Sequence, residues 1–273
     1  MPDILFGRNP VLEALRAGRD LRRLLLAPGL APDPRLAEIC QRAEALGVAP
    51  TEVPRARLSD IAHTEHHQGV AAYFAARQLE GLDALQAVAT GAPAGWPALL
   101  LCLDQVQDPQ NLGSLARSAE AFGVSALVVL RHRAAPLTGS VAKASAGAIE
   151  HLRLLQVSNL AQALDRLHRL GVWVVGLDGQ AERSLVEVDL AGPLALVVGA
   201  EGVGLRQLTR RACDELATLP TGGRVGSLNA GVAGAVALFE VARQRGFAYP
   251  GPKRGRRRSS DLYSPAQADV AQR

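Results

Sequence analysis

Apolar runs and helical apolar stripes alternate along the N-terminal part of the chain. Short apolar runs between turn residues predict strands at residues 21–26, 48–53 and 70–74. Apolar residues at helical spacing, bounded by signals such as Asn9-Pro10, Gly18 and Gly47, predict helices at residues 9–18, 34–46 and 57–62. Strands that alternate with helices imply a small α/β domain.

The pattern restarts more strongly at Ala98. Residues 98–103 are almost all apolar, as expected for a strand of a parallel sheet that is buried on both faces. Further apolar runs predict strands at residues 126–130, 172–177, 194–198 and 215–219. Apolar stripes at helical spacing predict helices at residues 112–122, 158–170, 205–212 and 230–239. This half of the chain therefore predicts a second α/β domain, built on a parallel sheet.

A segment rich in Gly and Pro separates the two halves. It covers residues 78–97 and predicts a linker between an N-terminal domain at 1–77 and a second domain at 98–246.

Residues 247–273 form a basic tail. From Gly246 onward there are six Lys/Arg and two Asp/Glu, out of 30 and 26 in the whole chain, which leaves 24 of each elsewhere. Such a tail is either a solvated segment or an electrostatic arm for nucleic acid.

Composition narrows the class of protein. The 273 residues are 48% hydrophobic and 4% aromatic, which fits a globular protein without a platform of stacked aromatic rings. No uninterrupted apolar stretch approaches about 20 residues, so no membrane helix is expected. The N-terminus lacks the basic and apolar regions of a signal peptide. Cys40, Cys102 and Cys213 lie far apart, so we expect reduced thiols in a cytoplasmic protein.

Three predicted strands of the second half run into loops rich in Gly, Asn or Pro, each followed by a helix. These loops are residues 104–113, 199–204 and 219–229. In open α/β sheets, ligands bind beyond the carboxyl ends of the strands, where backbone N–H groups at helix starts face them. We therefore expect the loops to converge on one pocket, although each alone is equally typical of an ordinary connection. The polar side chains around it would be Asn111, Arg117, Glu201, Ser227 and Asn229.

Several common sites do not fit this pattern. Gly199, Gly202 and Gly204 lack the spacing of a dinucleotide-binding loop, and no Gly-Lys-Ser/Thr phosphate loop is present. The sequence also lacks a serine nucleophile elbow and a carboxylate pair suited to a glycosidase. His63 and the His66-His67 pair suggest a metal site at first. Because no second ligand cluster exists, a solvated or RNA-facing loop fits better, and no metal is expected.

Three motifs carry a resemblance to a known family. They are Asp108-Pro109-x-Asn111-Leu112-Gly113 with Arg117-Ser118-Ala119, then Val198-Gly199-Ala200-Glu201-Gly202-x-Gly204-Leu205, and Leu219-Pro220 through Ser227-Leu228-Asn229. In this order they resemble the motifs of the SpoU (TrmH-type) family of RNA ribose 2′-O-methyltransferases, in the SPOUT (α/β-knot) superfamily. Phe6-Gly7-Arg8-Asn9-Pro10 and His67-Gln68-Gly69-Val70 resemble the family's N-terminal substrate-binding domain. The branch that the chain resembles most modifies a guanosine in the peptidyl-transferase region of bacterial 23S rRNA.

The resemblance implies a fold, a methyl donor and an assembly. The fold would be a Rossmann-like parallel sheet with a deep trefoil knot, the donor S-adenosylmethionine, and the assembly a homodimer. Donor contacts would fall on Leu177, Gly199, Leu219 and Leu228. RNA contacts would fall on Arg8, His67, Gln68 and Arg117. Gly231 and Gly234 lie inside the last predicted helix at a cost of about 1 kcal/mol each against alanine, which would suit a backbone packed closely there.

The family assigns removal of the ribose 2′-hydroxyl proton to the position of Arg117. A guanidinium is a poor base because its pKa ordinarily lies above about 12. We therefore interpret Arg117 as an anchor for phosphate and a stabiliser of the developing oxyanion. Asn111 and Glu201 would orient Arg117 or the ribose. Ser227 and Asn229 would shape the pocket and bind RNA.

Two departures from the family pattern occur in the third motif region. Thr221 stands where methionine is common, and Gly231 stands in place of a second serine, so Gly231 is given no polar role.

Three alternatives stay open. The chain would be a tRNA ribose methyltransferase, a resistance methyltransferase acting on another rRNA site, or a non-catalytic RNA-binding protein that keeps the fold.

Overall fold

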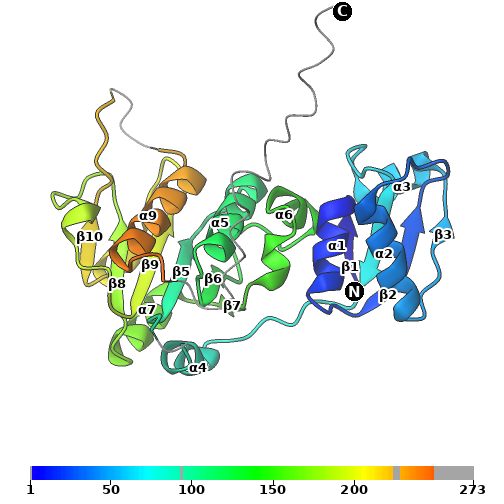
Figure 1. Ribbon diagram of the computed structural model, residues 1–273. Coiled ribbons are helices and arrows are strands. Elements are labelled where there is room, and N and C mark those ends of the chain that lie inside the picture. Colours follow the sequence, from blue (N-terminus) through cyan, green and yellow to red (C-terminus); the bar gives the residue numbers. More distant parts are fainter. Residues whose placement is uncertain (1, 93–94, 224–227, 249–273) are drawn as a thin grey trace, which may run out of the picture.

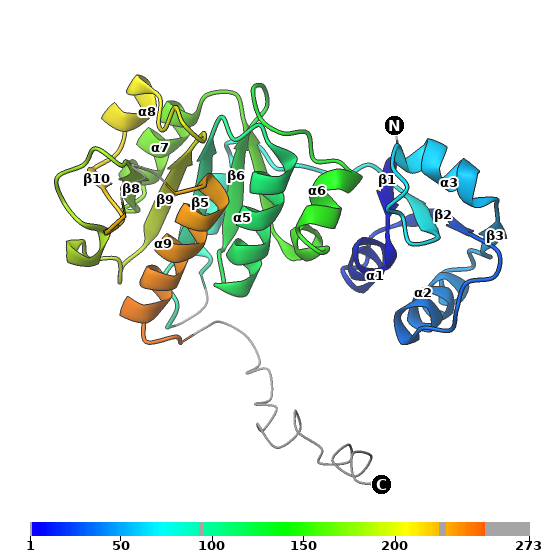
Figure 2. The same cartoon turned by 90° about the horizontal axis from the view of Figure 1, so that it is seen from above.

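The computed structural model describes residues 2–92, 95–223 and 228–248 and contains two α/β units (Figure 1). The α/β class predicted for both halves is confirmed. Seen from above, helix α6 (Gly139–Ala144) of the larger unit faces strand β1 (Asp3–Phe6) of the smaller (Figure 2). Ser227 and nearly all of the basic tail lie outside the described residues. The proposed domain limits and the trefoil knot stay predictions.

The smaller unit is built on a mixed four-stranded sheet, within the described residues, in the order β1-β4-β2-β3. Strand β4 is antiparallel to both β1 and β2, whereas β3 runs parallel to β2. The further strands are β2 (Leu21–Leu26), β3 (Thr51–Glu52) and β4 (Val70–Phe74). The helices are α1 (Arg8–Arg16), α2 (Pro34–Ala45) and α3 (Arg55–Ala62). Strand β1 was not predicted, and β3 is shorter than the predicted residues 48–53.

The larger unit is built on a parallel sheet, with six strands among the described residues in the order β10-β8-β9-β5-β6-β7. Every adjacent pair in it is parallel. The strands are β5 (Leu99–Asp104), β6 (Ala126–Leu130), β7 (Leu154–Val157), β8 (Trp173–Leu177), β9 (Leu194–Gly199) and β10 (Glu215–Ala217). Strands β5 and β9, at the centre, are buried along their whole length, as the apolar runs predict. Strand β7 was not predicted.

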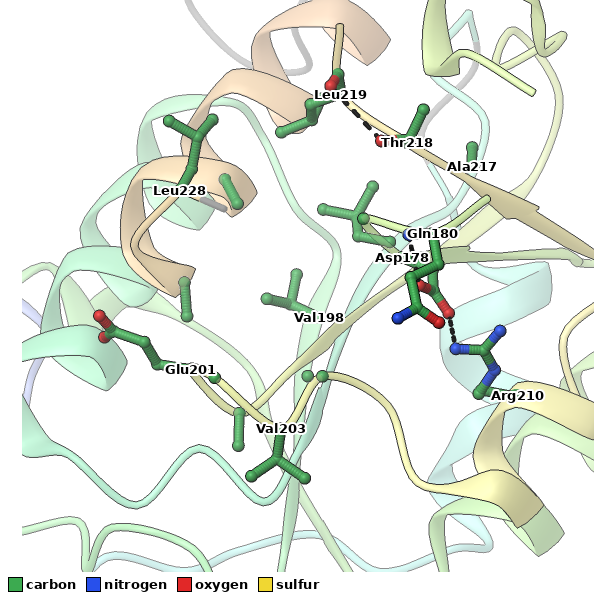
Figure 3. Close-up of a pocket in the computed structure, with 18 of the residues that line it drawn as sticks. Asp178, Gln180, Val198, Glu201, Val203, Arg210, Ala217, Thr218, Leu219 and Leu228 are labelled. Carbon is green, nitrogen blue, oxygen red and sulfur yellow. Dashed lines mark hydrogen bonds and ion pairs between the residues drawn. The ribbon is translucent and has the colours of Figure 1, made fainter. Parts of the chain in front are cut away.

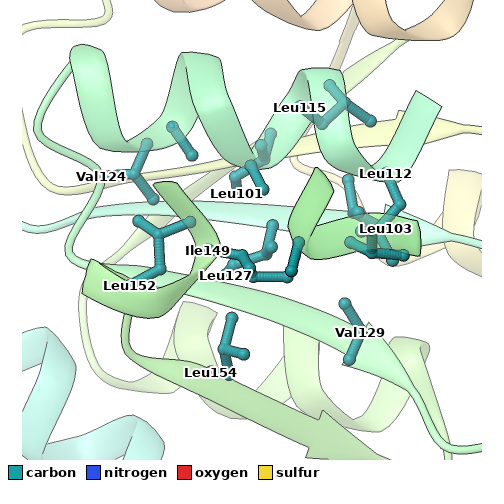
Figure 4. Packing of buried hydrophobic residues seen from close by; sticks show 14 of the residues in the cluster. Leu101, Leu103, Leu112, Leu115, Val124, Leu127, Val129, Ile149, Leu152 and Leu154 are labelled. Carbon is teal, nitrogen blue, oxygen red and sulfur yellow. The ribbon is translucent and has the colours of Figure 1, made fainter. Parts of the chain in front are cut away.

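Helices cover both faces of the parallel sheet. Besides α6, they are α4 (Ala84–Thr90), α5 (Pro109–Ala121), α7 (Leu160–Arg169), α8 (Gln207–Arg211) and α9 (Ala230–Gln244), with short 3-10 turns at Ala148–His151 and Leu185–Glu187. Successive residues of a strand point to opposite faces. Leu101 and Leu103 of β5 therefore join the α5 and α9 side of the core (Figure 4), whereas Leu100 and Cys102 join the α4 and α7 side.

Helices α5 and α9 pack closely together. A Cβ atom added to Gly234 would lie 2.2 Å from Leu115 Cδ2, and one added to Gly231 would lie 3.0 Å from Ser114 Cβ. The nearest atoms beside these glycines are side-chain atoms of α5 in the same chain, whereas the prediction was a closely packed backbone. Both glycines are accounted for without a second subunit.

The segment predicted as a linker contributes to the larger unit. It contains α4, whose Leu85 and Val88 are buried against the sheet. Glu80 forms a parallel bridge with Leu155 of β7, and Arg153 binds the Glu80 carboxylate at 2.5 Å. The segment rich in Gly and Pro therefore contains a short helix. Helix α4 is stabilised by its packing against a sheet whose residues lie far away in the sequence.

A buried carboxylate joins the two units. Glu150, whose side chain is fully buried, pairs with Arg19 at 3.2 Å and with Arg77 at 2.5 Å, both from the N-terminal half. Arg19 also binds Asp3 at 2.7 Å. Since breaking one partner of a buried ion pair typically costs about 3–5 kcal/mol, this cluster fixes the two units relative to each other.

Candidate active site

The first turn of α5 presents Asn111 to the carboxyl edge of the parallel sheet. Asp108 caps the helix, and its carboxylate accepts from the backbone N–H groups of Gln110 at 3.2 Å and Asn111 at 3.0 Å. Pro109 follows in the first helical position, where its missing N–H costs nothing. Asn111 itself is 7% exposed, so its side chain is held in one direction.

Asn111, Glu201 and Asn229 bind one another across three loops. Asn111 Nδ2 donates to Glu201 Oε2 at 3.0 Å. Asn229 Nδ2 donates to Asn111 Oδ1 at 2.8 Å and to Glu201 Oε2 at 2.9 Å. The Asn229 side-chain oxygen caps α9 by accepting from Gly231 N at 2.9 Å. The convergence predicted from the loops is therefore present for these three side chains.

Arg117 is exposed on α5, less than two turns beyond Asn111. Within the described residues it has no hydrogen-bond or ion-pair partner. Its guanidinium thus keeps all five donors for an external ligand. Ser227, the remaining polar residue of the predicted set, lies outside the described residues.

A cavity of about 390 Å³ opens where β8, β9 and β10 end (Figure 3). The four residues predicted to contact the methyl donor line it: Leu177, Gly199, Leu219 and Leu228. A Cβ atom on Gly199 would lie 2.3 Å from the carbonyl carbon of Gly204, so only glycine lets the following loop fold back. Gly202 and Gly204 have φ of 77° and 72°, which a side chain rarely allows. These glycines let backbone form part of the cavity wall, and side chains complete it.

The polar wall of this cavity was not predicted. Asp178 and Gln180 follow β8 and face the cavity, and Asp178 forms an ion pair with Arg210 (Figure 3). Both follow the end of a strand, so the rule that pointed to the other loops would have found them. Asp104, fully buried at the end of β5, accepts from Arg206 N at 2.8 Å and Arg206 Nε at 2.7 Å. This contact fixes the loop after Gly204.

Comparison with known proteins identifies the family. The model of the SpoU rRNA Methylase family matches residues 98–239, more than half of the chain. The chain belongs to the SpoU rRNA methylase family. The family model for RNA 2′-O ribose methyltransferase substrate binding matches residues 4–80. As a SpoU methylase the chain is an RNA methyltransferase.

Among relatives of this SpoU methylase is a protein named 23S rRNA (guanosine-2′-O-)-methyltransferase RlmB from Xanthomonas campestris. The two are 42% identical over 241 residues, 88% of this chain and 96% of the relative. An uncharacterized tRNA/rRNA methyltransferase of Synechocystis is 40% identical over 248 residues, and the match spans 91% of this chain but 64% of that protein.

Solved structures agree with the fold of this SpoU methylase. A structure of an RNA 2′-O ribose methyltransferase superposes with a TM-score of 0.73 at 28% identity, covering 89% of this chain and 88% of the other. The SpoU methyltransferase AviRb from Streptomyces viridochromogenes, solved with the cofactor AdoMet, superposes with a TM-score of 0.76 at 24% identity over 91% of each chain. The second likeness supports the fold alone.

The predicted RNA contacts in the substrate-binding part of the SpoU methylase differ in their exposure to solvent. Arg8 is half-buried, and its guanidinium binds Asp33 at 2.8 Å. The backbone N–H of Arg8 donates to the side-chain oxygen of the exposed Gln68 at 2.9 Å. His67 is 2% exposed. Its Nδ1 accepts from Gly69 N at 3.0 Å, and Nε2 lies 3.2 Å from Ser59 Oγ. One ring nitrogen thus holds the loop of His67 and the other contacts α3, so the ring is buried in this structure and an RNA contact of His67 stays a prediction.

Burial changes the pKa of both cysteine thiols of the larger unit. Burial, with the nearby charges of Asp214 and Asp104, raises the pKa of Cys213 to about 12, so the thiol stays protonated at neutral pH. Burial also raises the pKa of Cys102. Within the described ranges no cluster of three His, Cys, Asp or Glu is placed to hold a metal ion. In the same ranges, no helix is long and apolar enough to cross a membrane.

Proposed function

We propose that the protein transfers a methyl group from S-adenosylmethionine to a ribose 2′-oxygen of RNA, at a guanosine in the peptidyl-transferase region of 23S rRNA. The observation that carries this proposal is the set of hydrogen bonds among Asn111, Glu201 and Asn229, which joins three loops at the edge of the sheet. These loops lie beside the cavity lined by the residues predicted to contact the donor. The proposed RNA specificity is supported by the 42% identity to the X. campestris protein, which the match covers almost completely.

The cavity suits such a donor. Its volume of about 390 Å³ falls in the range of small-molecule sites. Val198, Leu219 and Leu228 offer apolar surface, and Asp178 and Gln180 offer polar groups on the opposite wall (Figure 3). When bound, the donor would supply the methyl group: the ribose 2′-oxygen bonds to the methyl carbon in line with the breaking C–S bond, S-adenosylhomocysteine leaves, and the 2′-hydroxyl proton is released. The chain supplies the fixed geometry, because the tight packing at Gly199 and the bonds from Arg206 to Asp104 leave residues 200–205 little freedom.

Arg117 is the side chain that we expect to bind the RNA substrate directly. Its exposed guanidinium, which has no partner among the described residues, can bind an RNA phosphate or the developing 2′-oxyanion. Glu201 and the two asparagines hold the loops on either side of the donor cavity and orient the ribose. Ser227, outside the described residues, is assigned to RNA binding.

A second copy of the chain is the partner that the exposed side of α9 fits best. Val232, Val236 and Phe239 recur at helical spacing and are 48%, 45% and 49% exposed. Phe239 is flanked by the rings of Phe122 and Phe247, with centroids 6.2 Å and 5.6 Å away. An apolar stripe of this kind beside the active site supports a homodimer.

Mapping 2′-O-methyl marks in rRNA and tRNA of a strain lacking the gene tests the proposal. We expect one guanosine of the peptidyl-transferase region to lose its mark, and a plasmid copy to restore it. Loss of a mark in tRNA, or at another rRNA site, would favour the alternative methyltransferase readings. An unchanged set of marks together with RNA binding by the pure protein would favour a non-catalytic binder.

A further inference from the structure

A second cavity lies between the two units, beside the active site. It has a volume of about 820 Å³. One wall comes from β1 and the end of α3, and the other from α6 and the first turn of α5. Helix α6 packs against both α5 and β1 (Figure 2), and the Glu150 cluster holds these walls together. The cavity is therefore a fixed feature of the docked units.

Polar groups line the rim of this interdomain cavity. Lys143, the one lysine before the tail, donates to His66 O at 2.7 Å and keeps two further donors for a ligand. His63 and His66 are exposed on the facing wall. His63 has a φ of 50°, a strained backbone that the surrounding loop must hold in place. The histidine loop noted in the sequence thus meets a cation from the other unit.

The floor of the cavity is apolar, and its one acidic group on the described lining is already paired. Ile4, Phe6 and Ile61 contribute the apolar surface. The Asp3 carboxylate binds Arg19 at 2.7 Å and accepts from Arg77 N at 3.0 Å, so its charge is compensated. An apolar floor under a rim that holds Lys143 and further hydrogen-bonding groups suits a nucleotide, with its base inside and its phosphate at the rim.

Helix α5 connects this cavity to the active site. Gln110 lines the cavity, whereas its neighbour Asn111 binds Glu201. Gln110 and Arg117 are seven residues apart, so they lie on the same face of α5, about 10 Å apart along the axis. A single RNA strand bound along this face would reach Arg117 and the cavity together.

We propose that the interdomain cavity is an RNA subsite that holds a nucleotide flanking the methylated one, with Lys143 on its phosphate. The proposal rests on the proposed function, because the ligand is a part of the same RNA. It gives the N-terminal unit a second task besides carrying RNA: one wall of the subsite comes from it.

Two variants test the subsite with the full-length protein and 23S rRNA transcribed in vitro. Lys143→Gln removes the cation, and Ser140→Trp fills the cavity from its exposed lining without removing a charge. Arg169→Gln, which removes an exposed cation at the end of α7, is the matched control. The measurements are the Kd for RNA at several salt concentrations, kcat and KM for methyl transfer, the Kd for S-adenosylmethionine and Tm.

Both cavity variants should raise the Kd and KM for RNA about tenfold, with Tm and donor affinity near those of the control. Lys143→Gln should also lower the slope of log K against log salt by about 1, and Ser140→Trp should leave the slope unchanged. The subsite is refuted if wild-type protein methylates the rRNA and both variants match Arg169→Gln. It is also refuted if Lys143→Gln weakens binding without a change in slope and Ser140→Trp has no effect, since Lys143 would then only join the units. A wild-type protein that methylates no RNA refutes the proposed function instead.

Discussion

Replacing Gly199 by alanine should damage the donor cavity through sterics alone. The added methyl group would lie 2.4 Å from Gly204 O and 2.6 Å from Leu205 N, besides its contact with the Gly204 carbonyl carbon. All of these are backbone atoms, which cannot rotate away as a side chain would. Asp104 fixes Arg206 immediately beyond them. The loop must therefore either bear the overlap or move out of the cavity wall.

The size of the effect follows from overpacking, which costs about 1–3 kcal/mol in a well-packed interior. Backbone contacts on both sides place Gly199→Ala near the upper value, about 3 kcal/mol. For a domain of this size, such a loss lowers Tm by about 6–12 °C. If the loop moves instead, the donor loses part of its wall, and we expect its affinity to fall at least tenfold, about 1.4 kcal/mol.

Thermal unfolding and calorimetric titration with S-adenosylmethionine measure both effects. Gly81→Ala is the control, because it makes the same chemical change at an exposed glycine with no heavy atom within 4 Å of the added Cβ. The control should change Tm little. A Gly199→Ala protein with the Tm and donor affinity of the control would refute the reasoning, since the loop would then not need to approach Gly199.

Three further predictions follow from named contacts. Asn229→Ala removes the cap of α9 and should lower the free energy of unfolding, measured by urea denaturation, by about 1 kcal/mol. The variant also loses the hydrogen bond to Asn111 and should therefore slow methyl transfer. An unchanged rate would argue against the role of the loop network. Burial and the charge of Arg55 lower the pKa of His67, with Glu65 opposing, so the unfolded chain takes up the proton first and stability should fall as pH drops below about 6.5. A His67→Gln variant should lose less stability than wild type over that pH range, and equal losses would contradict this. Phe239→Glu should shift sedimentation from dimer to monomer, whereas Leu46→Glu, at a similarly exposed position, should not.

Much of the larger unit could be predicted because its signals are local. A strand buried on both faces is apolar throughout, and β5 and β9 therefore stand out in the sequence. The start of α5 carries a local signal too, the cap formed by Asp108 and Pro109, although the helix was predicted only from residue 112. The convergence of Asn111 and Asn229 followed from one rule of sheet geometry.

What the sequence did not reveal depends on distant partners. Strand β1 is four residues long and exists because β4 pairs with it. Helix α4 lies in a breaker-rich segment and is held by burial of Leu85 and Val88. His67 appeared to be a surface residue because histidine is polar, yet its ring is buried by the fold of its own loop. The docking of the two units through Glu150 has no signal in the sequence, because its partners lie far apart along the chain.

The central claim is tested most directly by methyl transfer with a donor carrying an isotopically labelled methyl group. The purified protein is incubated with this donor and 23S rRNA transcribed in vitro, and the nucleosides are separated and identified by mass spectrometry. We predict one labelled product, 2′-O-methylguanosine, from wild type and none from Arg117→Ala, although that variant keeps its Tm and its affinity for the donor. Label on a base, no label at all, or full activity of Arg117→Ala would contradict the account.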